Sequence, residues 1–115
     1  MGNAGSSGPA DMESTEAKYI QQTVKDNCVV IFSKSYCPYC DDAEKIFKRL
    51  NVGATKIELD DRRDGAKIQN ILGHMTGAFT VPRVFVNGSC IGGASETTQL
   101  LKNGKLQQLI NQCGN

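Results

Sequence analysis

The sequence predicts a single α/β domain in which a four-stranded mixed sheet is flanked by helices on both faces. The chain has 115 residues, enough for one domain and too few for two. Apolar runs typical of buried strands alternate with segments whose apolar residues recur at helical spacing. The pair Asn87-Gly88 divides the last apolar run and is a strong hairpin signal, because both residues tolerate a positive φ.

The first half of the domain predicts the order helix, strand, helix, strand. A helix ends near Asp26, and the run "CVVIF" at residues 28–32 follows as a strand buried on both faces. Helical spacing resumes at Asp41, and "TKIELD" alternates as a second strand. Because a helix connects these two strands, we expect them to pair in parallel. The apolar positions of the two helices are Ala17, Ile20 and Val24, then Ala43, Ile46, Phe47 and Leu50.

The second half predicts helix, hairpin, helix, helix. Strands on either side of Asn87-Gly88 form the hairpin, and Ser95 is expected to cap the helix after it. Gly104 separates that helix from a last one at about residues 105–112. The apolar positions of the helix before the hairpin are Ile68, Ile71, Leu72 and Met75, and those of the helix after it are Leu100 and Leu101.

The first residues predict a tail and a compartment. Residues 1–12 are rich in Gly, Ser and Ala and are expected to be a disordered tail before a domain at residues 13–115. The first 19 residues contain neither an apolar leader nor an Arg, so we expect a cytoplasmic protein. No run is long and apolar enough to span a bilayer, although "MGNAGS" fits the pattern for N-myristoylation at Gly2. A net charge of +1 gives no general reason to expect nucleic acid as a partner.

Cys37 and Cys40 stand two residues apart where a strand gives way to a helix. Structural zinc needs four ligands, and the chain has one such pair and a single histidine, His74, so we expect no metal. His74 is expected on the surface. Two incidental buried thiols would not suit an exposed turn. Redox chemistry suits it, because a helix N-terminus stabilises a thiolate and lowers its pKa.

This geometry assigns a role to each cysteine. Cys37 at the helix N-terminus is the predicted nucleophile, and Lys34 adds a positive charge nearby. Cys40 lies one helical turn further on, close enough to form a disulfide with Cys37 and release a bound partner. Pro38 suits the first helical position, where no backbone N–H is needed.

The motif "CPYC", together with "TVPRVFVNG" and "IGG" downstream, resembles the dithiol glutaredoxin family, and the likeness runs from about Tyr19 to Cys113. It implies a thioredoxin-like fold and an enzyme that uses glutathione to reduce protein–glutathione mixed disulfides and protein disulfides. Its expected partners are glutathione and such proteins, and the chain is expected to be a monomer. The alternative is a redox or iron sensor, a homodimer bridged by a [2Fe-2S] cluster with Cys37 and glutathione as ligands.

The resemblance also implies a glutathione site. Lys34 and Gln69 match positions that hold the glycine carboxylate, and the backbone of Val81, before an expected cis-Pro82, would pair with the glutathione cysteine. The γ-glutamyl carboxylate would meet backbone N–H groups at a helix start. The implied binding residues are Lys34, Tyr39, Gln69, Thr80, Val81, Pro82, Gly93, Ala94 and Ser95.

Two further features depend on the resemblance. Many family members have Cys-Asp-Asp after the paired glycines, whereas this chain has "ASE", which leaves Glu96 as the acidic side chain for the γ-glutamyl amine. The likeness is nearest to the vertebrate glutaredoxin-2 branch, in which cysteines matching Cys28 and Cys113 are joined. It therefore implies a structural disulfide between these two, with Cys90 left as a single thiol.

Overall fold

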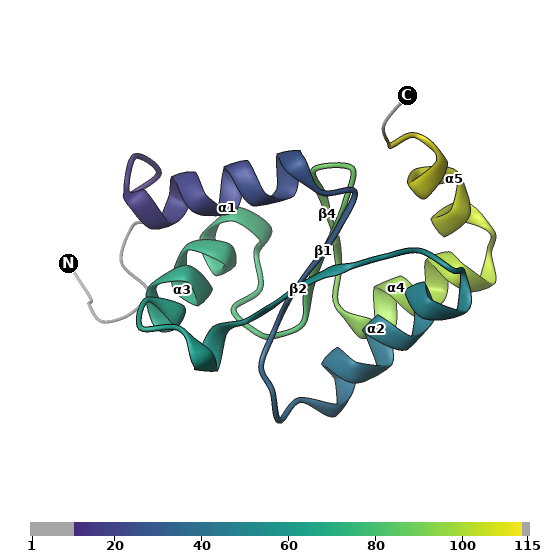
Figure 1. Ribbon diagram of the computed structural model, residues 1–115, viewed down its shortest axis with the longest axis horizontal. Helices are drawn as coiled ribbons and strands as arrows, with labels where there is room; N and C mark the ends of the chain where they lie inside the picture. The colour runs from purple at the N-terminus through teal and green to yellow at the C-terminus, as the bar shows by residue number, and fades with distance from the viewer. Residues whose placement is uncertain (1–10, 114–115) are drawn as a thin grey trace.

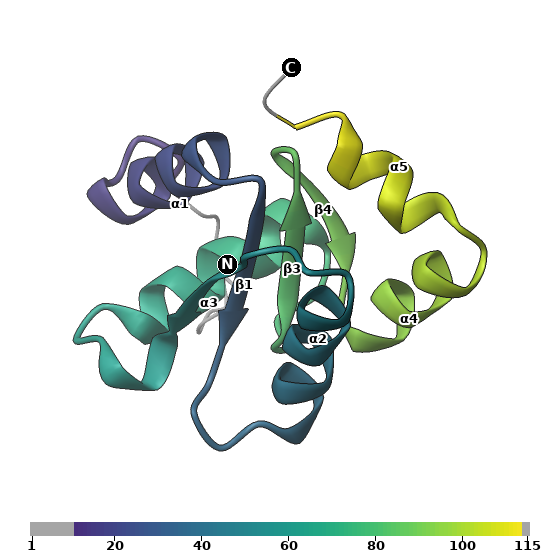
Figure 2. The same ribbon diagram turned by 45° about the vertical axis from the view of Figure 1, so that its right-hand side comes forward.

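The computed structural model describes residues 11–113 and has three layers (Figure 1). Helices α1 and α3 lie on one side of the central sheet, and α2, α4 and α5 lie on the other (Figures 1 and 2). The predicted order of elements is confirmed, with one short 3-10 helix, η2, added after β2. The elements are α1 Thr15–Asp26, β1 Val29–Ser33, α2 Pro38–Arg49, β2 Thr55–Glu58, η2 Leu59–Asp61, α3 Gly65–Thr76, β3 Arg83–Val86, β4 Ser89–Gly92, α4 Ala94–Lys102 and α5 Lys105–Asn111.

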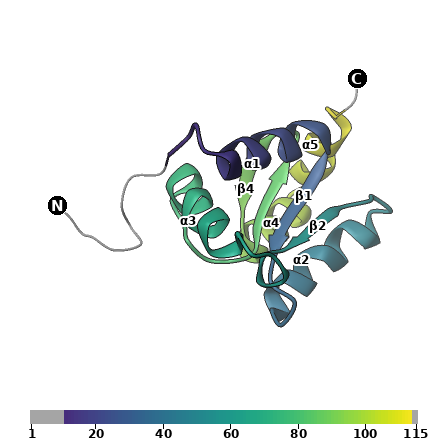
Figure 3. The same ribbon diagram turned by 60° about the vertical axis from the view of Figure 1, so that its left-hand side comes forward.

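The sheet has the strand order β2-β1-β3-β4, and Figure 3 views it from another side. Strand β1 pairs in parallel with β2 and antiparallel with β3, so the predicted mixed sheet is confirmed. Every residue of β1 is buried, as expected for a central strand covered on both faces. The hairpin between β3 and β4 turns at Asn87 and Gly88, whose φ values are 53° and 82°.

Alternate residues of β1 divide the core into two clusters. Val30 and Phe32 pack with α1 and α3, whereas Val29 and Ile31 face α2 and α5. A strand covered on both faces sends successive side chains to opposite layers, so a five-residue run serves both clusters. Both layers of helices therefore pack against β1. The turn that contains Cys37 follows the end of this strand.

Three local expectations were wrong. Leu59 lies in η2 and does not continue β2, and Met75 is partly exposed and does not belong to the core. Gly93 is the N-cap residue of α4 and its N–H donates to Glu96, so Ser95 lies inside the helix. The last helix agrees with its prediction, since α5 ends at Asn111 with Gln112 as its C-cap residue.

The predicted tail and the Gly2 modification site fall largely on residues 1–10, outside the described residues. Between residues 11 and 113, no helix is long and apolar enough to cross a membrane.

Candidate active site

Cys37 is the N-cap residue of α2, at the turn that follows β1. Its Sγ accepts a hydrogen bond from the backbone N–H of Cys40 at 3.1 Å. Cys37 is half-buried and Cys40 is fully buried, and the structure holds the pair as a disulfide with a Cα–Cα distance of 5.2 Å. An N–H group at a helix start stabilises a thiolate at Sγ once the disulfide is reduced.

The loop before β3 approaches this sulfur from the other side. The peptide bond between Val81 and Pro82 is cis, and the carbonyl oxygen of Val81 lies 4.0 Å from Cys37 Sγ. Val81 is half-buried. The backbone next to the cis bond therefore lies beside the reactive sulfur, where an extended ligand backbone could pair with it.

A groove of about 330 Å³ lies on this side of the molecule. It is lined by Tyr39 together with residues 80–83 and 93–96. Seven of the nine residues expected to bind glutathione line it, drawn from α2, the loop before β3 and the start of α4. These are Tyr39, Thr80, Val81, Pro82, Gly93, Ala94 and Ser95.

Lys34 and Gln69, the other two expected residues, do not line the groove. Lys34 is half-buried in the turn between β1 and Cys37, and its carbonyl accepts a hydrogen bond from the Cys37 N–H at 3.2 Å. The side-chain amide of Gln69 donates to the carbonyl of Phe79 at 2.7 Å. Gln69 thus holds the loop that leads into the groove.

Asp60 in η2 anchors the cysteine turn. Its Oδ1 accepts the backbone N–H of Ser35 at 2.9 Å, and its Oδ2 accepts the Ser35 hydroxyl. These hydrogen bonds lower the pKa of Asp60, and the charge of Lys34 lowers it further. The turn that presents Cys37 is therefore tied to a carboxylate 25 residues away from Ser35 in sequence.

The first turn of α4 is stabilised by the side chain of Glu96, which lies in that same turn. Oε1 of Glu96 accepts the backbone N–H of Gly93 at 2.8 Å, which is the Glu96 half of a capping box, because Gly93 has no side chain to form the other half. The hydrogen bond from Gly93 lowers the pKa of Glu96, and the nearby Arg83 charge adds to this shift. Glu96 is therefore a carboxylate at neutral pH, and Oε1, one of its two oxygens, already accepts the hydrogen bond from Gly93.

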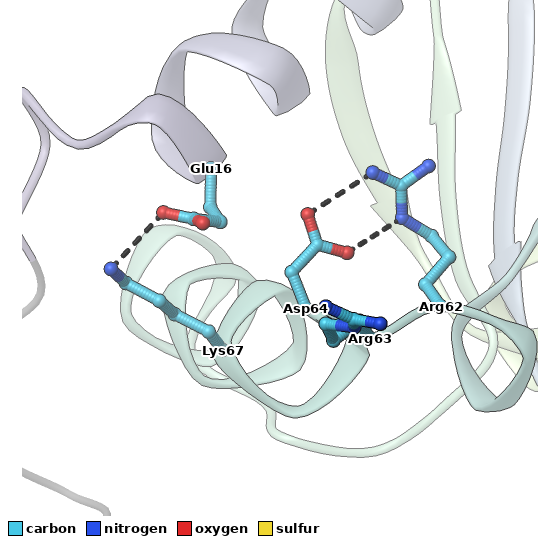
Figure 4. Close-up of a pocket in the computed structure, with 5 residues that line it drawn as sticks. All are labelled: Glu16, Arg62, Arg63, Asp64 and Lys67. Carbon is cyan, nitrogen blue, oxygen red and sulfur yellow. Dashed lines mark hydrogen bonds and ion pairs between the residues drawn. The ribbon is translucent and has the colours of Figure 1, made fainter.

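A wider cavity of about 640 Å³ lies where α1 meets α3 (Figure 4). Four of its five charged side chains form two pairs: Lys67 contacts Glu16 at 3.1 Å, and Arg62 holds Asp64 through two hydrogen bonds. Lys67 lowers the pKa of Glu16, and Arg62 lowers that of Asp64. None of its five lining residues is a cysteine, so this cavity offers no site for thiol chemistry.

The other cysteines lie apart from the groove. Cys28, just before β1, and Cys113, just after α5, form a second disulfide with a Cα–Cα distance of 5.6 Å. Cys90 in β4 is the free cysteine of the described chain, and His74 is exposed as predicted. Among residues 11–113, no group of three or more His, Cys, Asp and Glu side chains could hold a metal ion. The iron–sulfur alternative at Cys37 stays a hypothesis that no structural feature favours.

Sequence reasoning missed three residues around the site. Arg83 lines the groove, and Tyr36 and Phe79 are large hydrophobic side chains with 72% and 45% exposure. Tyr36 directly precedes Cys37, and Phe79 and Arg83 flank the "TVP" stretch. The position of these three residues next to the cysteine and "TVP" motifs was the one feature of the sequence that could have identified them.

Comparison with known proteins identifies what this arrangement resembles. The family model described as Glutaredoxin matches residues 29–91. The chain is 50% identical over 113 residues to "Glutaredoxin-2, mitochondrial" of Rattus norvegicus, covering 98% of this chain and 72% of that protein. It is 48% identical over 108 residues to the Homo sapiens protein of the same name, covering 94% and 66%. The crystal structure of a buckwheat glutaredoxin–glutathione complex superposes with a TM-score of 0.84 at 40% identity, covering 86% of this chain and 90% of that one.

The expectation of a cytoplasmic protein was wrong. Five relatives that are 47% to 50% identical to the chain carry the word mitochondrial in their names. The expectation depended only on the lack of a leader signal in the first 19 residues. A compartment is specified by a targeting signal and not by the packing of the domain, so neither the core nor the cysteine motif could have revealed it.

Proposed function

Because this chain belongs to the glutaredoxin family and is therefore a thiol–disulfide oxidoreductase, we propose that it reduces protein–glutathione mixed disulfides with Cys37 as the nucleophile and Cys40 as the resolving thiol. One observation carries the assignment of roles: Cys37 caps α2 and is half-buried, whereas Cys40 lies one turn further on and is fully buried. An external disulfide therefore meets the more exposed Cys37 first, and Cys40 is within disulfide distance of Cys37.

In the reaction with a glutathionylated protein, the Cys37 thiolate attacks the glutathione sulfur. The bond between that sulfur and the protein sulfur breaks, and the protein thiolate leaves and takes up a proton. A second glutathione, as its thiolate, then attacks the glutathione sulfur bound to Cys37. Oxidised glutathione leaves, and the Cys37 thiolate is restored next to the Cys40 N–H.

Protein disulfides would follow the dithiol route. Cys37 attacks one sulfur of the client, and the Cys40 thiolate then attacks Cys37 and releases the client as a dithiol. This leaves a Cys37–Cys40 disulfide, the form that the structure holds. Two glutathione molecules return it to the dithiol and leave as oxidised glutathione.

The groove supports glutathione as the co-substrate. Val81 and the start of α4 both line the groove. The backbone of Val81 can pair with an extended peptide, and the first N–H groups of α4 can bind an anion. Lys34 and Gln69 would meet the glycine end from the neighbouring turn and helix. The mitochondrial names of five relatives support mitochondria as the place of this activity.

The proposal is tested with a glutathionylated peptide as substrate and glutathione as the reductant. We expect Cys37→Ser to lose all turnover, because no other thiol occupies the helix N-terminus. Cys40→Ser should still reduce the glutathionylated peptide but lose most reduction of a peptide disulfide. Cys90→Ser removes a thiol outside the groove and serves as the matched control, with wild-type rates expected for both substrates.

Turnover that survives in Cys37→Ser would overturn the assignment of the nucleophile. Equal loss of both activities in Cys40→Ser would show that Cys40 is needed in the monothiol step, contrary to the proposed roles.

A further inference from the structure

A second hollow lies between α2 and α4, which lie side by side (Figures 1 and 2). Its volume is about 430 Å³. Residues 42–49 of α2 and residues 98–102 of α4 supply its lining, which includes three cations, one carboxylate and two aliphatic side chains. These are Lys45, Arg49 and Lys102, then Asp42, then Ile46 and Leu101. We call this hollow the basic cleft.

The three cations of the basic cleft are not neutralised. None of them forms an ion pair with another described residue, and Asp42 is the one acidic residue in the lining. The cavity of Figure 4 differs, because two of its three cations are paired with its two carboxylates. In a chain whose net charge is +1, the basic cleft is therefore a local excess of positive charge.

The helices alone do not account for this cluster. A helix C-terminus favours a cation, which explains Arg49 and Lys102 as the last residues of α2 and α4. Lys45 lies one turn before Arg49, outside the last turn of α2, and like charges four residues apart on a helix repel each other. An anion bound between them would remove this repulsion.

The lining also indicates what kind of anion fits. Ile46 is 7% exposed and Leu101 is half-buried, so an apolar wall lies among the cations. No aromatic side chain lines the basic cleft, which disfavours stacking of a nucleic-acid base. A bilayer is also disfavoured, because the large exposed hydrophobic side chains of the described chain all lie elsewhere. A polypeptide segment with carboxylates around an aliphatic side chain fits both the charge and the wall.

The basic cleft lies further along the same two helices whose first turns line the groove. Tyr39 of α2 and residues 94–96 of α4 line the groove, and the basic cleft begins at Asp42 and Thr98. Cys37 caps α2, so Lys45 and Arg49 lie roughly 12 and 18 Å from it along the helix axis, at about 1.5 Å per residue. An extended polypeptide covers that distance in about four to six residues.

We propose that the basic cleft is a docking site for client proteins, in which an acidic segment of the client binds while its disulfide reacts at Cys37. The inference rests on the proposed function and adds a class of partner to it. The three cations bind the carboxylates of the segment, and an aliphatic side chain of the segment packs on Ile46 and Leu101. Clients with such a segment close to the reactive cysteine react faster than other clients.

The experiment measures the second-order rate constant with which the pre-reduced enzyme releases a fluorescent peptide from its disulfide with glutathione. Acidic peptides carry the segment Glu-Leu-Glu-Glu about four residues before or after their cysteine, and neutral peptides carry Gln in place of each Glu. For the better-placed segment, we expect the wild type to release the acidic peptide about tenfold faster than its neutral match at low salt. Added salt should reduce this preference, because it screens exposed charges.

Two variants test the residues of the basic cleft. Lys45→Gln, Arg49→Gln and Lys102→Gln, combined in one protein, should remove the preference and leave the rate constant for the neutral peptide unchanged. Lys45→Glu combined with Arg49→Glu should reverse it, so that a peptide with Lys in place of each Glu reacts faster than the neutral one. A purely structural role of these side chains would not reverse with the charge of the peptide.

The matched control changes two lysines and one arginine that are exposed outside the basic cleft, as Lys18→Gln, Lys25→Gln and Arg63→Gln. Both triple variants have the same net charge, and we expect the control to keep most of the preference. If both lose it equally, the overall charge is responsible and the inference is overturned.

Three further outcomes would overturn the inference. These are equal rate constants of the wild type for acidic and neutral peptides, equal slowing of both peptides in the triple variant of the cleft, and binding of that cleft to phosphatidylserine vesicles without any peptide preference. If the wild type releases no peptide from any glutathione disulfide, the proposed function fails. Fluorescence anisotropy of a labelled acidic peptide without cysteine then still decides docking, since it should bind the wild type and not the triple variant.

Discussion

Asp60 shows how one side chain can fix the turn that presents a nucleophile. It accepts both the N–H and the hydroxyl of Ser35, two residues before Cys37. Hydrogen bonds to the charged form of a carboxylate lower its pKa and stabilise the fold in which they occur. The same contact therefore links stability to the order of the active-site turn.

We expect Asp60→Asn to lower the melting temperature by a few degrees at pH 7. Because the folded-state pKa of Asp60 is lowered, its stabilisation is complete above the ordinary value of 3.8 and is lost as the pH falls through the lower folded-state pKa. Thermal unfolding of both proteins between pH 7 and pH 2 measures this, and the two melting temperatures should converge in acid.

Asp61→Asn removes the neighbouring charge, which is exposed, and is the matched control. If the difference in melting temperature between wild type and Asp60→Asn stayed constant down to the lowest pH, the stabilisation by Asp60 would not come from its charge.

At the scale of elements, Lys56 joins β2 to α2, the helix that carries both active-site cysteines. Its ammonium contacts Asp41 and Glu44 at 3.1 Å each and Glu58 at 3.6 Å, and 17% of its side chain is exposed. Burial alone lowers the pKa of Lys56, but hydrogen bonds to Glu44 and Asp41 outweigh it, and the net shift is upward. The other oxygen of Glu58 is buried without a partner among the described residues.

We expect Lys56→Met to destabilise the protein by about 1–2 kcal/mol, between the values for exposed and buried ion pairs, because three carboxylates lose their shared cation. Since the folded-state pKa of Lys56 is raised, its stabilisation is complete below the ordinary value of 10.5 and is lost as the pH rises through the folded-state pKa. Urea unfolding at pH 7 and above pH 10.5 measures the free energy of unfolding.

Lys48, on the exposed side of α2, makes no ion pair with another described residue, so Lys48→Met makes the same substitution and should change stability little. A loss of equal size in both variants would show that the effect comes from the helix surface and not from the link to β2.

At the scale of the whole molecule, the Cys28–Cys113 disulfide closes a loop across 85 residues. It ties the end of α5 to the start of the central strand, and both residues pack on the core cluster beneath α2 and α5. We expect Cys113→Ser to lower the free energy of unfolding by about 3–5 kcal/mol, because the unfolded chain regains the freedom that the cross-link removed. Turnover should not change, since neither residue lines the groove.

Denaturant unfolding with and without a reductant that cleaves this disulfide provides the control, because reduced wild type and Cys113→Ser should be equally stable. Peptide mapping after alkylation without reduction decides the pairing directly. Recovery of both cysteines as freely alkylated thiols would contradict the disulfide.

The sequence by itself determined the class of the fold and the position of the cysteine pair. Strands, helices and the hairpin follow from spacing and from turn residues such as Asn87 and Gly88, which act over a few neighbours and are visible along the chain. The placement of Cys37 at a helix start is equally local. The limits of local signals also explain the error at the start of α4. Gly93 and Ser95 are both possible N-cap residues, and the spacing of the sequence alone does not decide between them.

Only the tertiary structure decided which side chains meet. The contact of Asp60 with Ser35, the turn of Gln69 toward Phe79 and the approach of Arg83 to Glu96 all join segments that the sequence shows apart. Such contacts depend on strand register and on how each helix packs against the sheet, which are set by the whole core at once. The cysteine chemistry could therefore be predicted from a few adjacent residues, whereas the groove proposed to bind glutathione exists only after the sheet has brought its three segments together.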